Sequence, residues 1–239
     1  MITLSAAIDR VQILSIEHLI PIGLAIIIAI ALITYARRVS AESQYRNIHS
    51  IAIFISVTVI AFHVYSMYST DYNMRTDLPL YLCSLLGIII PIFTYYRKYW
   101  MFEILIFWII AGTLQGVITP DIAEGFPSLD YFRYWIVHLG LLTIIFYSIL
   151  VLKLKPKLKS VFKSFLALQV YVVLMIIINY VLDANYFYLN RKPASASVLD
   201  YFGDWPYYII VGQLIIIPLF LLIYLPFYIS EVKKKSLSK

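Results

Sequence analysis

Charged side chains are scarce in this chain: Asp, Glu, Lys and Arg make up 13% of its 239 residues. A soluble globular domain carries about a quarter of such residues. Because 62% of the residues are hydrophobic, the chain has too few charges to cover a surface in water. This scarcity excludes a soluble globular protein and predicts an integral membrane protein.

Cysteine is nearly absent as well. Its single occurrence, Cys83, excludes an intramolecular disulfide and any metal site built on several cysteines. The sequence also lacks a glycine-rich phosphate loop. The last apolar run, 207–229, has no lysine that would form a Schiff base with retinal. We therefore expect neither a metal nor another cofactor.

Long apolar runs take up most of the chain. Each is near the roughly 20 residues that a helix needs to cross the hydrocarbon core of a bilayer. Only helices and closed barrels satisfy every backbone group in lipid, and continuous apolar runs select helices. The prediction is an all-α, polytopic membrane protein with one domain, residues 1–239. Its seven transmembrane helices are expected at about 18–36, 50–68, 78–96, 101–119, 134–152, 162–182 and 207–229.

Basic residues alternate with the apolar runs. The net charge of +6 is compatible with a nucleic-acid partner. However, most of the Lys and Arg residues follow odd-numbered runs, and this distribution argues against a nucleic-acid partner. The positive-inside rule instead predicts an outer N-terminus and a cytoplasmic C-terminus in the plasma membrane, with the basic loops beside anionic headgroups. The residues on the cytoplasmic side are Arg37, Arg38, Arg46, Arg97, Lys98, Lys153, Lys155, Lys157, Lys159, Lys163, Lys233, Lys234, Lys235 and Lys239.

The N-terminal residues have neither the basic start nor the cleavage site of a signal peptide. Leu4, Ile8, Val11 and Leu14 fall at helical spacing. This spacing predicts a short helix on the outer surface of the membrane. The alternative is a frayed terminus.

Two uncommon side chains share one predicted depth. Cys83 and His138 lie about 8–9 Å inside the outer ends of the third and fifth runs, at 1.5 Å per residue. A thiol that faces an imidazole is a nucleophile beside its base. Amides and imidazoles in lipid tend to face a bundle interior or a cavity. We expect a polar pocket that opens outward and is also lined by His63, Ser84, Gln115, Asn179 and Gln213.

Each of these residues has an alternative structural role. A lone membrane cysteine is more often a small packing residue than a nucleophile. Intramembrane histidines and amides also serve as hydrogen-bonding contacts between helices. The tyrosines that gather at the ends of the runs are typical of an interfacial aromatic belt.

The two long outer loops, 119–133 and 183–206, carry further candidates, because long connections are often functional lids. Asp121 and Asp130 are candidates to orient His138. Arg191 and Lys192 are candidates to bind a phosphate headgroup, although a solvated charge pair is the more common case.

Several motifs occur in a characteristic order over most of the chain. They are Leu78-Pro-Leu-Tyr-Leu-Cys83-Ser84-Leu, Gln115 with Thr119-Pro-Asp121, Phe126-Pro-Ser-Leu-Asp130-Tyr-Phe-Arg-Tyr-Trp-Ile-Val-His138, and Asn179-Tyr, Asn185-Tyr, Lys192-Pro and Gly203-Asp-Trp-Pro-Tyr. In this order they resemble the YwaF-like family of bacterial integral membrane proteins. That family is distantly similar to a mammalian membrane acyltransferase of ether phospholipids and to the androgen-induced transmembrane hydrolases of fatty-acid esters.

Those relatives use a Cys or Thr nucleophile with a His on another helix. The resemblance therefore implies Cys83 as the nucleophile and His138 as its base. Tyr81, close to the candidate nucleophile, stands where many relatives carry histidine, and it is a further pocket candidate.

The preferred hypothesis is acyl transfer or acyl-ester hydrolysis on a membrane lipid, a phospholipid or a fatty-acyl ester. Gln115, Asn179 or Gln213 would donate to the oxyanion. The alternative is a multi-pass transporter or substrate-binding module that uses the same pocket for its ligand. A receptor-like seven-helix protein is a third interpretation. Nothing in the sequence determines the oligomeric state.

Overall fold

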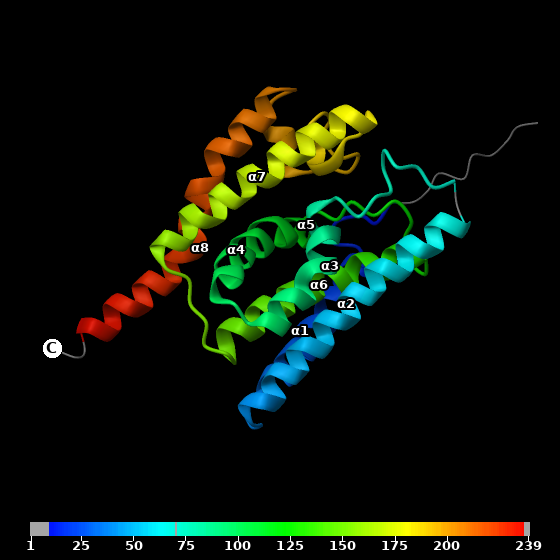
Figure 1. The fold of residues 1–239 in the computed structure, drawn as a ribbon. Coiled ribbons are helices and arrows are strands. Elements are labelled where there is room, and N and C mark those ends of the chain that lie inside the picture. Colours follow the sequence, from blue (N-terminus) through cyan, green and yellow to red (C-terminus); the bar gives the residue numbers. More distant parts are fainter. Residues whose placement is uncertain (1–9, 70, 237–239) are drawn as a thin grey trace, which may run out of the picture.

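The computed structural model describes residues 10–69 and 71–236. The predicted N-terminal surface helix falls mainly on residues 1–9, which lie outside the described residues. The regular structure of the described residues is entirely helical, as the sequence predicts (Figure 1). The elements are α1 Ile16–Ala36, α2 Ala41–Ser69, α3 Leu82–Tyr96, α4 Tyr99–Trp108, the π-helix η1 Ile109–Thr113, α5 Leu114–Ile118, α6 Leu129–Leu150, α7 Leu158–Leu182, the short 3₁₀ helices η2 Tyr186–Tyr188 and η3 Val198–Phe202, and α8 Tyr207–Ser236.

Six helices among the described residues are long and apolar enough to cross a membrane, which confirms a multi-pass membrane protein. They are α1, α2, the continuous segment Tyr99–Ile118, α6, α7 and α8. The predicted span 78–96 differs: α3 begins only at Leu82 and has 15 residues, about 22 Å at 1.5 Å per residue. That length is short of a hydrocarbon core of about 30 Å.

The late start of α3 has a local cause. Pro79 disfavours a helical conformation at Leu78. The Leu80 amide donates to the Leu78 carbonyl in a tight turn, and Tyr81 is still extended at ψ 140°. Seven full spans are therefore not confirmed, and the orientation of the termini stays a prediction.

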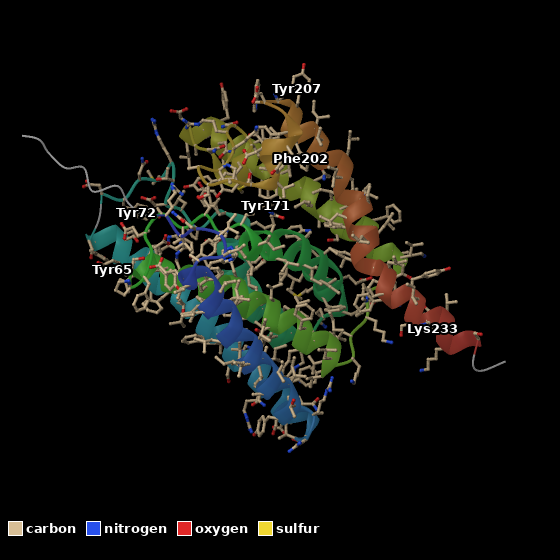
Figure 2. The ribbon with its side chains drawn as sticks, turned by 180° about the vertical axis from the view of Figure 1, so that it is seen from behind. Tyr65, Tyr72, Tyr171, Phe202, Tyr207 and Lys233 are labelled. Atoms are coloured by element: carbon tan, nitrogen blue, oxygen red, sulfur yellow. The ribbon has the colours of Figure 1, made fainter. Side chains whose placement is uncertain are left out.

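The short connections between helices and the long loops lie at opposite ends of the bundle. The α1–α2 turn, the α3–α4 turn, the α6–α7 linker and the end of α8 gather toward the lower left of Figure 1, and the three long loops toward the upper right. Figure 2 labels Tyr65, Tyr72, Phe202 and Tyr207 around the loop end, with Lys233 at the other. Because basic residues concentrate in the connections at the Lys233 end, this arrangement agrees with the alternation of basic residues in the sequence.

Helix α3 is packed between α2, α6 and η1. Leu86 and Ile90 on α3 are completely buried. Close approach of α2 to α6 depends on Gly140, because a Cβ there would lie 2.6 Å from Cδ1 of Ile55. This packing fixes the depth and rotation of the first turn of α3, which carries Cys83.

An ion pair between a buried carboxylate and a half-exposed ammonium joins α4 to α7 at the basic end. Glu103, 2% exposed, accepts from the Ser160 hydroxyl at 2.6 Å and from Nζ of Lys163 at 2.8 Å. A buried carboxylate without its cation is strongly unfavourable. The pair therefore holds α7 against α4 at this end of the bundle.

The substitution Lys163→Met tests this contact. It leaves the Glu103 carboxylate buried with the Ser160 hydroxyl as its remaining partner, and we expect a loss of about 1–3 kcal/mol of stability. Lys159→Met is the matched control, because Lys159 is exposed and forms no ion pair with any described residue. Thermal unfolding in detergent measures both variants, and equal melting temperatures would contradict the role of the pair.

Candidate functional site

Cys83 lies in the first turn of α3 and faces the π-helix η1. Its Sγ atom is 3.6 Å from the hydroxyl oxygen of Thr113, the last residue of η1, and either group is able to donate. Thr113 is completely buried. Single π-helical turns inside α-helices are frequent at functional sites. The thiol thus meets a polar partner at the one irregular turn of its neighbouring helix.

His138 is buried on α6 with a defined tautomer. Its Nδ1 lies 2.8 Å from the carbonyl oxygen of Tyr134, one turn back on the same helix. A carbonyl only accepts, so Nδ1 carries the hydrogen and Nε2 carries the lone pair of a neutral imidazole. Among the described residues, Nε2 has no hydrogen-bond partner. His138 therefore presents a free basic nitrogen.

Tyr134 and Gly116 fix where this nitrogen points. The Tyr134 ring stacks on the imidazole with centroids 3.9 Å apart, and its hydroxyl donates to the Gly116 carbonyl at 2.7 Å. A Cβ on Gly116 would lie 2.8 Å from Nε2 of His138. Nε2 therefore lies against backbone only three residues beyond Thr113, the partner of the thiol.

The structure brings Cys83 and His138 to the same segment, residues 113–116, from two different helices. They do not hydrogen-bond to each other in the described structure. The two side chains contact neighbouring turns of this segment.

The three predicted amides are engaged elsewhere. Asn179 clamps Tyr186, since it donates to the Tyr186 carbonyl at 2.9 Å and accepts from the Tyr186 amide at 2.7 Å. Gln115 donates to the Thr119 hydroxyl at 2.9 Å, within its own helix. Gln213 accepts from Gln169 at 3.0 Å, which links α8 to α7. Their depth alone did not reveal these partners.

The other predicted polar residues meet in a separate cavity of about 230 Å³ between α2, α3 and α6. His63, Tyr81 and Ser84 line it together with Asp130. It also contains Arg133, which was not among the site residues expected from the sequence. Its spacing from Asp130, one helical turn, is the signal that would have found it. Further lining residues are Phe62, Ser66, Thr76, Asp77 and Leu78.

Asp121 anchors the outer loops and does not hydrogen-bond to His138. Its carboxylate accepts from Arg10 at 2.6 Å, from Ser195 at 2.7 Å and from the Tyr188 hydroxyl at 3.2 Å. Asp130 also makes no hydrogen bond to His138; it pairs with Arg133. Neither carboxylate orients the imidazole, since the Tyr134 carbonyl already does so.

The loop 183–206 covers the region in front of α3. The Tyr186 hydroxyl donates to the Met74 carbonyl and accepts from the Leu78 amide. Burial raises the pKa of Tyr186 to about 12, so the hydroxyl stays protonated and keeps this contact at neutral pH. Lys192 lies 3.8 Å from Asp204, and Arg191 is exposed. Neither residue lines the 230 Å³ cavity.

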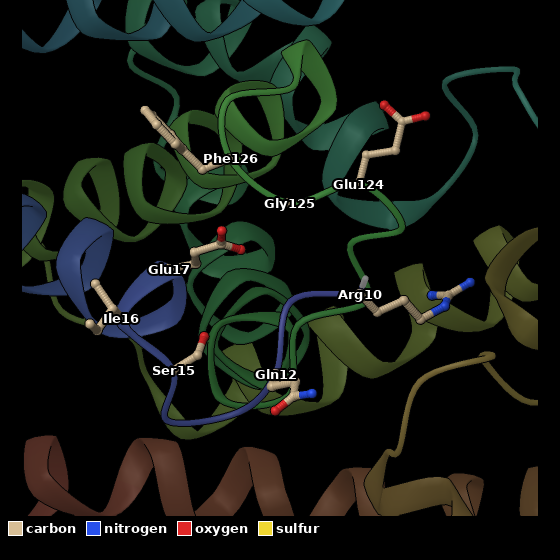
Figure 3. A pocket seen from close by; sticks show the side chains of 8 residues that line it. All are labelled: Arg10, Gln12, Ser15, Ile16, Glu17, Glu124, Gly125 and Phe126. Carbon is tan, nitrogen blue, oxygen red and sulfur yellow. The ribbon is translucent and has the colours of Figure 1, made fainter. Parts of the chain in front are cut away.

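A second, open pocket of about 670 Å³ lies outside this region (Figure 3). It is lined by Arg10, Gln12, Ser15, Ile16, Glu17, Glu124, Gly125 and Phe126. These residues come from the segment before α1, the start of α1 and the α5–α6 loop. It shares no lining residue with the cavity at Arg133, and neither Cys83 nor His138 lines it. No group of three or more His, Cys, Asp or Glu side chains able to hold a metal ion occurs among the described residues.

Comparison with known proteins identifies a membrane-protein family. The model of the TMEM164 family matches residues 13–224, which extend from just before α1 into α8. No curated protein and no solved structure matches the chain.

The substitution Gly116→Ala tests the contact that places His138. The added Cβ would lie 2.8 Å from Nε2 and 3.1 Å from the Tyr134 hydroxyl, so we expect a loss of roughly 1–3 kcal/mol from overpacking. Gly212→Ala is the control, because nothing lies within 4 Å of its Cβ position and alanine favours a helix. A Gly116→Ala variant as stable as Gly212→Ala would contradict the close contact between Gly116 and the imidazole.

Proposed function

This chain belongs to the TMEM164 family, and we propose that it is a membrane-embedded enzyme that transfers or hydrolyses the acyl group of a lipid ester. Cys83 is the nucleophile in this proposal, and His138 is its general base. The lipid is a phospholipid or fatty-acyl ester in the outer leaflet of the plasma membrane. The observation that carries the proposal is the unpartnered Nε2 of His138, which lies against the segment that Cys83 contacts.

The free Nε2 supports a role as base. A neutral imidazole with Nδ1–H held by a carbonyl accepts a proton at Nε2 and does not need to change tautomer first. A ring nitrogen of a buried residue such as His138 ordinarily has a partner. A substrate-bound complex supplies one, because catalytic hydrogen bonds are often loose in the free enzyme and tighten around the substrate.

The reaction follows from these positions. Nε2 of His138 takes the thiol proton, and the Cys83 thiolate forms a bond to the ester carbonyl carbon. The tetrahedral oxyanion then collapses, the carbon–oxygen bond to the alcohol breaks, and the imidazolium protonates the departing alkoxide. Water or the hydroxyl of a second lipid attacks the thioester in the same way and regenerates the thiol.

Thr113 supports stabilisation of the oxyanion. Its hydroxyl lies 3.6 Å from Sγ, whereas each of the three amides is engaged with another partner. Removing one donor from an oxyanion hole typically costs about 3 kcal/mol of transition-state stabilisation.

An acyl-enzyme assay tests the proposal. Purified protein is incubated with an ester lipid that carries an alkyne-tagged acyl chain, and we expect a protein-bound acyl group that hydroxylamine releases. Cys83→Ala removes the bound group, and His138→Gln slows its formation by about 10²–10⁴-fold, the usual contribution of a general base. His49→Gln is the control, because His49 bonds to Thr94 and lies in the first half of α2, far along the helix from the loop end.

Two outcomes would contradict the proposal. One is equal labelling of the wild type and of the Cys83→Ala variant. The other is a His138→Gln variant that labels as fast as His49→Gln.

A substrate-binding or transport module is the second candidate. The polar cavity of about 230 Å³ favours it, because an intramembrane cavity lined by His63, Asp130 and Arg133 suits a ligand pathway. Ligand uptake or binding that persists in Cys83→Ala, together with no acyl-enzyme in the wild type, would favour this function over catalysis.

A further inference from the structure

The cavity between α2, α3 and α6 contains hydrogen-bonding groups that the fold does not use. Both ring nitrogens of His63 are buried and have no partner at hydrogen-bond geometry, although the ring lies beside the Asp77 backbone. The Tyr81 hydroxyl has no hydrogen-bond partner among the described residues. Ser84 receives only a long contact of 3.4 Å from Arg133. A buried polar atom without a partner is costly in a membrane, so the two ring nitrogens of His63 indicate a ligand, and the Tyr81 and Ser84 hydroxyls line the same cavity.

Arg133 sets the charge of that ligand. Its Nε and Nη2 atoms donate to one oxygen of Asp130, and its guanidinium lies 4.6 Å from the centre of the Phe62 ring. The guanidinium has five N–H groups, so at least two of them remain available for a ligand. The aromatic contact and the ion pair together hold the guanidinium plane in place.

The acidic neighbours limit the ligand to a single negative charge. The Asp130 carboxylate already offsets the charge of Arg133. Asp77 also lines the cavity, but its oxygens accept from the Asn73 amide and the Thr76 hydroxyl. A doubly charged phosphate monoester would meet repulsion from both carboxylates, and the cavity lining has no second cation to offset it. A phosphodiester or a carboxylate carries one charge and suits the donors.

We propose that this cavity is a binding site for the singly charged oxyanion of an amphiphile, held by Arg133, His63, Tyr81 and Ser84. The cavity lies near the loop end of α2 and at the first turn of α6, the level at which polar headgroups meet hydrocarbon. Its volume is about 230 Å³, and its lining is largely polar, which suits a headgroup. The inference rests on the proposed function in one respect, that the ligand is a lipid.

The position of Ser84 connects this site to the thiol. Ser84 follows Cys83 on α3 and is turned by about 100° from it, so one side chain faces Arg133 while the other faces Thr113. An amphiphile with its oxyanion at Arg133 therefore has its next atoms beside the first turn of α3. Binding at Arg133 would select which lipid reaches the thiol.

Thermal shift on the purified full chain tests the site, with matched pairs of amphiphiles. Dihexanoyl phosphatidylglycerol is compared with dihexanoyl glycerol, decanoic acid with decanol, and inorganic phosphate is added alone. We expect a charged amphiphile to raise the melting temperature by roughly 5 °C or more at saturation over its uncharged partner. The pair with the larger difference identifies the source of the oxyanion, and a full shift from inorganic phosphate alone would overturn the lipid assignment.

Variants assign the shift to the cavity. Arg133→Gln should abolish it, whereas Arg75→Gln should keep it, because Arg75 is exposed and pairs with the exposed Asp183. His63→Gln gives a second readout if Arg133→Gln does not fold, since His63 has no internal hydrogen bond to lose. Equal shifts from charged and uncharged partners, no shift at all, or a shift retained in both cavity variants would overturn the proposal.

The Cys83→Ala variant separates this inference from the proposed function. Binding that survives in Cys83→Ala supports the site whatever the chemistry at the thiol. The wild type could form an acyl-enzyme and yet show no change in melting temperature that depends on the oxyanion. That result would support the proposed enzymatic function and overturn the proposed binding site.

Discussion

A polar atom inside a bilayer has no water to bond, so it must find its partner within the protein. This constraint organises the described structure. Asn179 is paired with Tyr186, Gln169 with Gln213, and Glu103 with Lys163. These bonds join neighbouring helices or hold a loop on the bundle. Against this background, the few buried nitrogens without a partner are the exceptions that need an explanation.

Nε2 of His138 has no hydrogen-bond partner among the described residues, and the two ring nitrogens of His63 are buried without one. The two imidazoles lie on different sides of α3. The first lies against the segment that carries Thr113, and the second faces Arg133 in the cavity. Cys83 and Ser84, adjacent in sequence, reach one cluster each. In the proposed function, the first turn of α3 would connect the thiol with the site proposed for a charged headgroup, and the shortness of α3 puts that turn near the loop end of the bundle.

Much of the fold was predictable because hydrophobicity and charge are properties of single residues. The apolar runs predicted where the long helices lie but not all of their ends, since α2 begins at Ala41 and not at 50, and α8 continues to Ser236 beyond 229. The alternation of basic residues predicted which connections gather at each end. Helix α3 begins later than predicted because of Pro79 and the tight turn from Leu78 to Leu80. A count of apolar residues detects neither feature.

The depth of the candidate site residues in the bilayer was predictable from the sequence. The direction in which each side chain points from its helix was not. Distance from the end of a run places Cys83, His138 and Gln213 at similar levels, because the rise per residue is constant. Which way each side chain points depends on the packing of neighbouring helices. Gln213 therefore turned out to face Gln169. In the sequence Arg133 is only a charge at the end of a loop, because its partners Phe62 and Ser84 are distant along the chain.

His138 presents an unprotonated Nε2 toward the segment that Cys83 contacts. Nitrogen NMR of protein with ¹⁵N-labelled histidine measures the protonation of both ring nitrogens, with the His138→Gln variant to assign the resonances. We expect a neutral ring with a protonated Nδ1 and an unprotonated Nε2, whose resonance shifts when Cys83 is alkylated. A ring protonated at Nε2, or a resonance unaffected by alkylation of the thiol, would contradict it.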